Sequence, residues 1–268
     1  MTREPESLAG SPRRPARPGP EFSVIVPTLD EEAHLDETLR RAKSALGPEA
    51  EVIVVDGGSR DRTAAIAAAH GRVLSTRPNR GGQLAAGARA ATGEILVFLH
   101  ADTWLPDGAA TAIRAAVRAG AEAGCFRFAL DPHAHGWRYR LLEWGVNWRT
   151  RWLHTATGDQ ALFATRGTYE ACGGFGDLPL FEDVTFVRAV RRVARFRLLP
   201  LAARTSSRRW EAGFLRTVVR HWALRAAFVA GADPRRLRRY HERPSGITES
   251  GVPPSRRAPR TSGSHPKR

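Results

Sequence analysis

The stretch "EVIVVDGGSRDRT", residues 51–63, decides the fold class. Its first half is an unbroken apolar run rich in β-branched residues, and its second half sets Asp56, Ser59 and Asp61 around two glycines. A continuous apolar run of this length is typical of a strand that is buried on both faces of a parallel sheet. The polar residues that follow it either close a turn or hold a ligand.

The same order of strand and helix recurs on both sides of this stretch. Apolar runs predict strands at 22–28, 51–55, 72–76 and 94–100. Helical periodicity and alanine-rich segments predict helices between and after them, at 31–46, 61–70, 82–91 and 106–119. A strand followed by a helix four times over predicts an α/β fold with a parallel sheet and right-handed crossovers.

The second half of the chain is less regular. We expect a strand at 124–130, an aromatic, arginine-bearing helix at 137–149, a strand, short helix and turn over 158–175, an acid-headed helix at 181–192, and a basic amphipathic helix at 210–230. The corresponding organisation is a disordered arm (1–20), a main domain (21–203), a basic amphipathic helical segment (204–242) and a disordered basic tail (243–268).

Acids follow three of the predicted parallel strands, in the segments "PTLDEE", "DGGSRD" and "HADT". Ligands of open α/β sheets bind at the carboxyl ends of the strands. Turn chemistry explains one such acid readily, but acids gathered at one edge repel each other unless a cation or hydrogen-bond donors meet them. The pattern therefore favours a ligand site at this edge.

The composition bounds the class of protein. The chain has 268 residues and a formal net charge of +15, and almost all of its basic residues are arginines. Such a charge attracts polyanions such as phosphorylated substrates, anionic lipids or nucleic acid, although a solvated arginine-rich surface explains it as well. No apolar run could span a bilayer, the N-terminus lacks the apolar region of a secretory signal, and two cysteines form no framework, so we expect a cytoplasmic protein.

Several common motifs are missing from the sequence. It contains no phosphate-binding G-x-x-x-x-G-K-[ST] loop, no G-x-G-x-x-G after the first strand, no G-x-S-x-G elbow and no zinc spacing among its histidines. P-loop chemistry, dinucleotide-dependent redox chemistry and α/β-hydrolase chemistry are therefore unsupported.

Five segments in order carry a resemblance: "VIVPTLDEE", "VVDGGSRDRT", "NRGGQLAAGARAATGEILVFLHADT", "GDQALFATRGTYEACGGF" and "FEDVTFVRAVRR". Over residues 22–230 the chain resembles family 2 glycosyltransferases, and among them the subgroup named for genes associated with radical-SAM and selenodomain proteins. The resemblance implies the GT-A nucleotide-diphospho-sugar transferase fold, a mostly parallel sheet flanked by helices, here with a C-terminal basic amphipathic helix. It also implies transfer of a sugar from a nucleotide-diphosphate-sugar donor to a hydroxyl acceptor.

Site residues carry over by position. The resemblance implies that Asp102 holds a divalent metal, Mg²⁺ or Mn²⁺, and that Asp183 is the catalytic base, paired with Glu182. The residues implied to contact the nucleotide-sugar are Pro27, Thr28, Glu31, Asp56, Asp61, Arg80, Gly81, Gln83 and Ala101. Those implied to form the sugar and acceptor pocket are Gly158, Asp159 and Gln160.

Two positions depart from the family pattern. The usual D-x-D motif reads "HAD" here, so His100 stands where an acid is common, and Gly57 occupies a position that is often acidic. One displacement assisted by a single carboxylate base leaves no covalent intermediate, so we expect inversion at the anomeric carbon. The alternatives are a nucleotidyltransferase-like enzyme, a non-catalytic nucleotide-binding protein and a basic nucleic-acid-binding protein.

The helix at 210–230 has two interpretations. It packs its aromatic face on the domain, or it lies on an anionic membrane with Arg216, Arg220 and Arg225 near the headgroups. The second interpretation predicts a peripheral protein at the inner face of the membrane and a lipid-linked acceptor.

Overall fold

A computed structural model describes residues 19–153, 155–211 and 213–241. The predicted C-terminal tail and nearly all of the predicted N-terminal arm lie outside the described residues. The described part is built on one eight-stranded sheet with the order β3-β2-β1-β4-β7-β6-β8-β5. The strands are β1 (Phe22–Thr28), β2 (Glu51–Asp56), β3 (Arg72–Ser75), β4 (Ile95–Phe98), β5 (Thr103–Trp104), β6 (Ala123–Leu130), β7 (Leu162–Thr165) and β8 (Phe196–Thr205).

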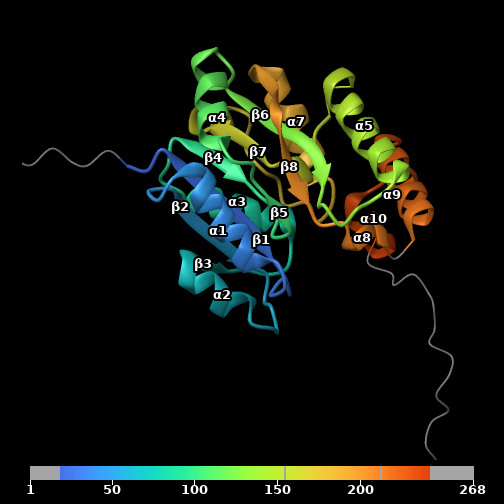
Figure 1. Cartoon of the computed structure of the whole chain (residues 1–268), viewed down its shortest axis with the longest axis horizontal. Helices are drawn as coiled ribbons and strands as arrows, with labels where there is room; N and C mark the ends of the chain where they lie inside the picture. Colours follow the sequence, from blue (N-terminus) through green and yellow to red (C-terminus); the bar gives the residue numbers. More distant parts are fainter. Residues whose placement is uncertain (1–18, 154, 212, 242–268) are drawn as a thin grey trace, which may run out of the picture.

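The helices lie on both faces of the sheet and at one end of the molecule (Figure 1). They are α1 (Leu35–Leu46), α2 (Thr63–His70), α3 (Arg80–Ala90), α4 (Ala109–Arg118), α5 (Trp137–Trp152), α6 (Arg166–Ala171), α7 (Glu182–Val193), α8 (Arg208–Glu211), α9 (Phe214–Val229) and α10 (Pro234–His241), with the short 3₁₀ helix η1 (Gly158–Gln160) before β7.

The first four predicted strands form the parallel half of the sheet, as expected. β1 pairs in parallel with β2 and β4, and β2 pairs in parallel with β3. β7 then pairs antiparallel with both β4 and β6, and β6 pairs in parallel with β8. The α/β fold with a mostly parallel sheet is therefore confirmed, and its carboxyl edge carries the three acid-bearing loops.

The apolar runs of the central strands are continuous because both faces of the sheet are covered. Val24 and Val26 of β1 pack in one core cluster with Leu39 of α1, whereas Ile25 packs in a second cluster with Leu84 of α3 and Phe186 of α7. Successive side chains of a strand point to opposite faces, so a strand between two helix layers must be apolar at every position.

The strand β8 is not predicted by the sequence pattern. It contains Pro200 and two arginines, which argue against a central strand. The structure accommodates the proline where the register with β6 shifts, between Cys125 and Arg127, because a bulge there removes the need for the missing N–H. The expected domain boundary after residue 203 also falls inside this strand.

Two helix boundaries differ from the expected ones. The helix expected at 31–46 begins only at Leu35, because the backbone N–H groups of Glu31 and Glu32 bond to side chains of a neighbouring loop. The helix expected at 210–230 is divided into α8 and α9, with Gly213 between them at a φ of 139°. A positive φ of this kind favours glycine and interrupts a helix.

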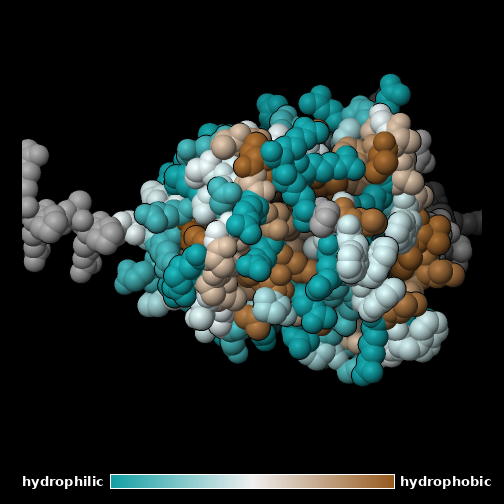
Figure 2. Space-filling view, turned by 90° about the horizontal axis from the view of Figure 1, so that it is seen from above, coloured by the Kyte–Doolittle hydropathy of each residue, from teal (hydrophilic) through white to brown (hydrophobic). Residues whose placement is uncertain are grey.

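α5 and α9 lie side by side at one end of the molecule (Figure 1), where the rings of Tyr139 and Phe214 are 5.4 Å apart. Most of the large apolar side chains that the described residues expose belong to these two helices and to the residue after α5. They are Trp137, Leu141, Trp144, Trp148, Trp152, Leu153, Leu215, Val219, Trp222 and Val229, the apolar surface of α5 and α9. In Figure 2 hydrophobic residues gather at this end, on the right. Among the described residues, no helix is long and apolar enough to cross a membrane.

Candidate active site

The loops after β1 and β2 are joined by hydrogen bonds at the carboxyl edge of the sheet. The N–H of Asp30 donates to Ser59 Oγ over 2.9 Å, and the N–H of Glu31 donates to Thr63 Oγ1 over 2.8 Å. Asp61 accepts hydrogen bonds from the hydroxyl and from the N–H of Thr63, the second over 2.9 Å, and these two bonds lower the pKa of Asp61. These hydrogen bonds therefore join the loop after β1 to the loop after β2.

Asp56 lies at the centre of that pair and is buried. One of its carboxylate oxygens accepts from the N–H groups of Gly58 and Ser59, each over 3.0 Å, and the other accepts from the hydroxyl of Thr28 over 3.3 Å. This is the turn-forming use of an aspartate, and it shapes the surface that a nucleotide would meet. A direct contact from Asp56 to the base or ribose stays a prediction.

Several other residues that were expected to contact the nucleotide make buried contacts at the carboxyl edge of the sheet. The amide of Gln83 donates to the carbonyls of Thr28 and Val55 over 2.9 and 2.7 Å, which joins the ends of β1 and β2. The carbonyl of Ala101 accepts from Thr38 Oγ1 over 2.7 Å, and Pro27 is buried within β1. Gln83 and the backbone of Ala101 thus organise the edge through buried hydrogen bonds.

At two positions of this edge, Gly81 and Gly57, neighbouring atoms come so close to the backbone that a side chain would crowd them. A Cβ at Gly81 would lie 2.3 Å from the carbonyl oxygen of Gly176. A Cβ at Gly57 would lie 3.2 Å from both the Gln83 amide and the carbonyl of Thr28. The departure from an acid at position 57 therefore has a packing reason, since the Gln83 amide occupies the adjoining space.

Asp102 follows β4 and meets a side chain delivered by the unpredicted strand β8. Arg208 places Nη2 at 2.6 Å from Glu31 Oε2 and at 3.5 Å from Asp102 Oδ2. A positive group thus lies between two carboxylates, and carboxylate oxygens are also the ligands that Mg²⁺ and Mn²⁺ prefer. Within the described residues no group of three or more metal-ligating side chains occurs, and Glu31 and Asp102 are the neighbouring acids whose chemistry fits such a cation.

His100, the residue in place of the usual acid, couples this edge to the predicted base. Its Nδ1 lies 2.8 Å from Asp159 Oδ1 in η1. Gly158 packs so closely on the ring that a Cβ there would lie 2.1 Å from Nε2. The N–H of Gly158 in turn donates to Asp183 Oδ2 over 2.8 Å. The histidine therefore positions the turn that holds Asp183.

Asp183 and Glu182 open α7 but have different environments. Asp183 also accepts from the N–H of Val184 over 2.6 Å and lines a pocket. Glu182 is 2% exposed, its Oε1 lies 3.7 Å from Arg80 Nη1, and its Oε2 has no hydrogen-bond partner. Burial, together with the adjacent Asp183, raises the pKa of Glu182, so Glu182 retains a proton more readily and Asp183 is the available carboxylate.

The pocket has a volume of about 360 Å³ and lies between η1, α5, α7, α8 and α9. Asp159, one of the residues predicted to form the sugar and acceptor pocket, lines it. Gln160 is instead wholly buried beneath it, where its amide donates to the carbonyl of Phe126 and its Oε1 accepts from Thr150 Oγ1. Of the predicted pocket residues, Asp159 therefore faces the cavity, Gly158 holds Asp183, and Gln160 supports the turn from the interior.

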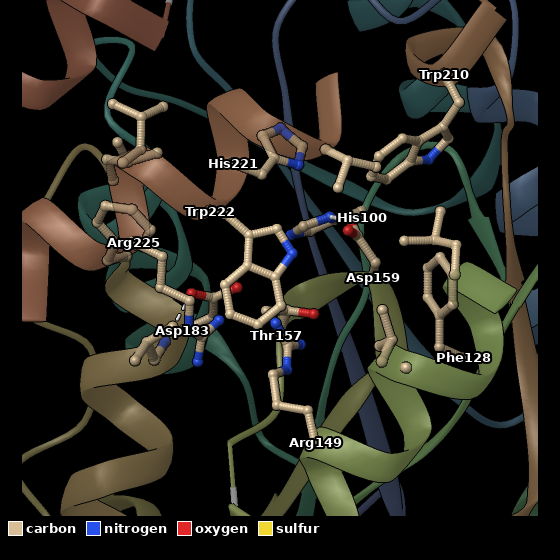
Figure 3. Close-up of a pocket in the computed structure, with 18 of the residues that line it drawn as sticks. His100, Phe128, Arg149, Thr157, Asp159, Asp183, Trp210, His221, Trp222 and Arg225 are labelled. Atoms are coloured by element: carbon tan, nitrogen blue, oxygen red, sulfur yellow. Dashed lines mark hydrogen bonds and ion pairs between the residues drawn. The ribbon is translucent and has the colours of Figure 1, made fainter. Parts of the chain in front are cut away.

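Two arginines of the pocket approach Asp183 from different helices. Arg149 of α5 and Arg225 of α9 extend toward its carboxylate, with the Trp222 ring beside them (Figure 3). The periodicity of the sequence does not indicate Arg149 as a site residue, and it suggests membrane headgroups as the contact for Arg225. The pairing of α5 with α9, which decides both positions, has no local sequence signal.

The fold and the site together combine an acid-bearing sheet edge, a carboxylate at a helix start and a pocket beside it. Residues 23–175, more than half of the chain, match the model of the family described as "Glycosyl transferase family 2". The chain belongs to this family.

Curated relatives match parts of the chain. An undecaprenyl-phosphate 4-deoxy-4-formamido-L-arabinose transferase of Pseudomonas aeruginosa is 33% identical over 96 residues, which are 31% of this chain and 28% of that protein. An uncharacterized glycosyltransferase of Mycobacterium tuberculosis is 32% identical over 139 residues, 51% of this chain and 62% of that protein. The chain thus spans less than two thirds of the length of these relatives.

Solved structures share the fold. Residues 1–349 of TarS from S. aureus superimpose with a TM-score of 0.57 at 21% identity, covering 70% of this chain and 60% of that one. The mannosyltransferase PcManGT from Pyrobaculum calidifontis, solved with GDP-Man and Mn²⁺, gives a TM-score of 0.58 at 20% identity, covering 86% and 69%. At these identities the likeness concerns the fold, and it agrees with the expected GT-A architecture.

Proposed function

We propose that this protein transfers a sugar from a nucleotide-diphosphate-sugar donor to a hydroxyl acceptor, with inversion and with Asp183 as the general base. The observation that carries the proposal is the position of Asp183 at the wall of the pocket, held by the Gly158 N–H in a turn that His100 joins to the strand end bearing Asp102. The sheet edge proposed for the donor, the proposed base Asp183 and the pocket proposed for the acceptor are thus adjacent. The radical-SAM and selenodomain-associated subgroup is our proposal for its place within the family.

The donor is proposed to bind along the edge formed by the loops after β1, β2 and β4. Glu31 and Asp102 would hold a divalent cation against the diphosphate, and Arg208 lies between the same two acids. When bound, the cation supplies Lewis-acid stabilisation of the leaving diphosphate. PcManGT, of the same fold, was solved with GDP-Man and Mn²⁺, which supports Mg²⁺ or Mn²⁺ as the cofactor here.

The acceptor is proposed to enter the pocket and to present a hydroxyl to Asp183. The carboxylate takes the hydroxyl proton as the oxygen attacks the anomeric carbon, a contribution of about 10²- to 10⁴-fold in rate. A single displacement inverts that carbon. Analysis of the product's anomeric configuration tests this step, and retention of the donor's configuration would contradict it.

The central test is a thermal-shift panel of nucleotide-sugars with Mn²⁺, applied to the wild type, Asp102→Ala and Asp107→Ala. We expect at least one donor to raise the melting temperature of the wild type by mass action. Asp102→Ala should lose the Mn²⁺-dependent part of this shift. Asp107 is exposed and lies before α4, outside the site, so Asp107→Ala should keep it. The proposal fails if no nucleotide-sugar stabilises the wild type.

We also propose that the protein works at the surface of an anionic membrane, on a lipid-linked acceptor. Tryptophan and arginine side chains beside one another favour the interface between headgroups and acyl chains. The apolar surface of α5 and α9 carries five exposed tryptophans, and its Leu141 and Trp222 also line the pocket, which supports this location. The Pseudomonas relative, named as an undecaprenyl-phosphate transferase, supports the acceptor class.

Vesicle flotation tests the membrane proposal. The full chain should float with vesicles that contain anionic lipid and should remain at the bottom with neutral vesicles, while the double variant Trp144→Ser, Trp148→Ser should float less. Equal sedimentation of the wild type with both kinds of vesicle would exclude this proposal and would leave the donor chemistry unaffected.

A further inference from the structure

The pocket contains two arginines that its own acids leave without an ion pair. Among the described residues, neither Arg149 nor Arg225 forms an ion pair, and Arg149 Nε is buried without a hydrogen-bond partner. Asp183 is the acid that acts most strongly on both, but its two oxygens already accept the N–H groups of Gly158 and Val184. Arg149 is half-buried, and its Nε is shut off from water without a partner, which costs free energy, so its position favours an anionic ligand.

Arg80, on another wall of the same pocket, provides the contrast. Burial acts to lower the pKa of Arg80, but the nearby carboxylates, Glu182 foremost, outweigh burial and raise it. Burial lowers the pKa of Arg149 to about 10, and the positive charge of Arg225 lowers it further instead of opposing the change. Burial also lowers the pKa of Arg225. The pocket therefore holds Arg80, which acids neutralise, and the pair Arg149 and Arg225, whose charges repel each other, while the guanidinium of Arg138 lies over the Phe214 ring.

The ligand that such a pair suits is a dianion. Planar guanidinium groups donate two parallel hydrogen bonds to the oxygens of a phosphate, and two of them can share one phosphate group. Figure 3 shows the Arg149 and Arg225 side chains reaching the same part of the pocket from α5 and α9, next to Asp183. An anion there would relieve the repulsion between the two cations.

Between α5 and α9 the pocket lining is largely apolar. Its lining beyond the arginines includes Leu142 and Val146 of α5 and Phe214 and Val218 of α9. A water-soluble phosphate would leave these side chains without a contact, whereas a hydrocarbon chain would bury them. The lining continues outward into Leu141 and Trp222, which are exposed at the apolar surface of α5 and α9.

We propose that Arg149 and Arg225 form an anion-binding acceptor subsite, which binds an amphiphile with its phosphate group at the two guanidinium groups and its apolar chain between α5 and α9. The assignment rests on the proposed function, because the bound phosphate sets the acceptor's reactive hydroxyl beside Asp183. It deepens that function by naming the acceptor as a phosphate-bearing lipid.

Calorimetric titration of the full chain tests the subsite with three probes: decyl phosphate below its micellar concentration, 1-decanol and inorganic phosphate. Decyl phosphate should bind more tightly than either of the others. Arg149→Gln and Arg225→Gln should each weaken decyl phosphate binding by about tenfold or more, as the loss of a charge-assisted hydrogen bond implies. The matched controls are Arg151→Gln on the exposed side of α5 and Arg236→Gln on α10, which should bind as the wild type does.

Two further measurements distinguish an effect on ligand binding from an effect on folding: a variant that fills the cavity, and the thermal unfolding of Arg149→Gln. Val218→Trp should remove the advantage of decyl phosphate over inorganic phosphate while inorganic phosphate still binds. Arg149→Gln should unfold at the same temperature as the wild type or at a higher one, because it removes a buried charge without a partner. A lower melting temperature would mean that Arg149 supports the fold, and it would overturn the assignment.

Each remaining outcome is decisive. Decyl phosphate that binds no more tightly than decanol, or that binds Arg149→Gln and Arg225→Gln like the wild type, overturns the anion subsite. Inorganic phosphate that binds as tightly as decyl phosphate identifies a soluble phosphate as the ligand and overturns the lipid assignment. Thermal shifts with nucleotide-sugars, measured on the same preparation, keep the two proposals apart: stabilisation by a donor without binding of decyl phosphate would reject the subsite alone.

Discussion

The two sides of the active site are built in different ways. The proposed donor edge consists of loops after parallel strands, and hydrogen bonds of 2.9 to 3.0 Å hold its acids Asp56 and Asp61. The proposed acceptor wall consists of α5, α7 and α9, and it combines apolar side chains with Arg149 and Arg225, which form no ion pair among the described residues.

This difference has a physical reason and a consequence. The proposed donor edge and α5 lie within the segment that matches the glycosyltransferase family model, whereas α7 and α9 lie beyond its end at residue 175. A parallel sheet brings its loops to one edge by topology, so one edge can serve many diphosphate-bearing donors. Helices added beside that edge can vary in lining without disturbing it, and they are the natural place for acceptor specificity.

Loss of the proposed base should lower turnover without weakening donor binding. With an acceptor that gives turnover, Asp183→Asn should lower kcat by about 10²- to 10⁴-fold, because it removes the proton acceptor. The thermal shift produced by the donor should remain, since the donor edge keeps its acids. Asp107→Asn, exposed and remote, serves as the control. Turnover of Asp183→Asn near the wild-type rate would assign the base to another group.

Adding a methyl group at Gly158, where η1 packs against His100, should lower both stability and turnover. Gly158→Ala would bring a Cβ against the His100 ring, so we expect a loss of about 1–3 kcal/mol in the free energy of unfolding. Turnover should fall as well, because the Gly158 N–H that orients Asp183 would move.

Gly167, in α6, is the matched control. A Cβ there meets nothing within 4 Å, so Gly167→Ala should raise stability by up to about 1 kcal/mol through helix propensity. Urea unfolding of both variants measures the contrast. Equal stability of Gly158→Ala and the wild type would show that His100 and η1 are not tightly coupled.

The smallest effect concerns the pH dependence of stability. The pKa of Glu182 is raised above its ordinary value of 4.5. In the window between that value and the folded-state pKa, the folded chain binds a proton that the unfolded chain releases, so this group's contribution to stability falls as pH rises. Glu182→Gln should therefore show a shallower decline of melting temperature above pH 4.5 than the wild type. The exposed control Glu49→Gln should keep the wild-type slope, and an unchanged slope in Glu182→Gln would contradict the assignment.

Much of the donor side could be predicted before the structure was considered. The apolar run at 51–55 and its neighbours indicated buried parallel strands, and the acids after them indicated a ligand edge. Roles within that edge were harder to predict. Gln83 was expected to contact the nucleotide; its amide nitrogen donates to the backbone carbonyls of Thr28 and Val55, a role that depends on α3 packing against the ends of β1 and β2, and the nucleotide contact stays a prediction.

The sequence by itself determined the alternation of strands and helices, the class of fold and the place of Asp102 and Asp183 at a strand end and a helix start. These features follow from local periodicity and from turn and helix-start chemistry, which neighbouring residues carry. Only the tertiary structure decided that β8 joins the sheet despite Pro200, that Arg208 meets Asp102, and that Arg225 turns into the pocket beside Arg149. Each of these depends on which distant faces pack together, and that choice is made by burial across the whole core and not by any short segment of the chain.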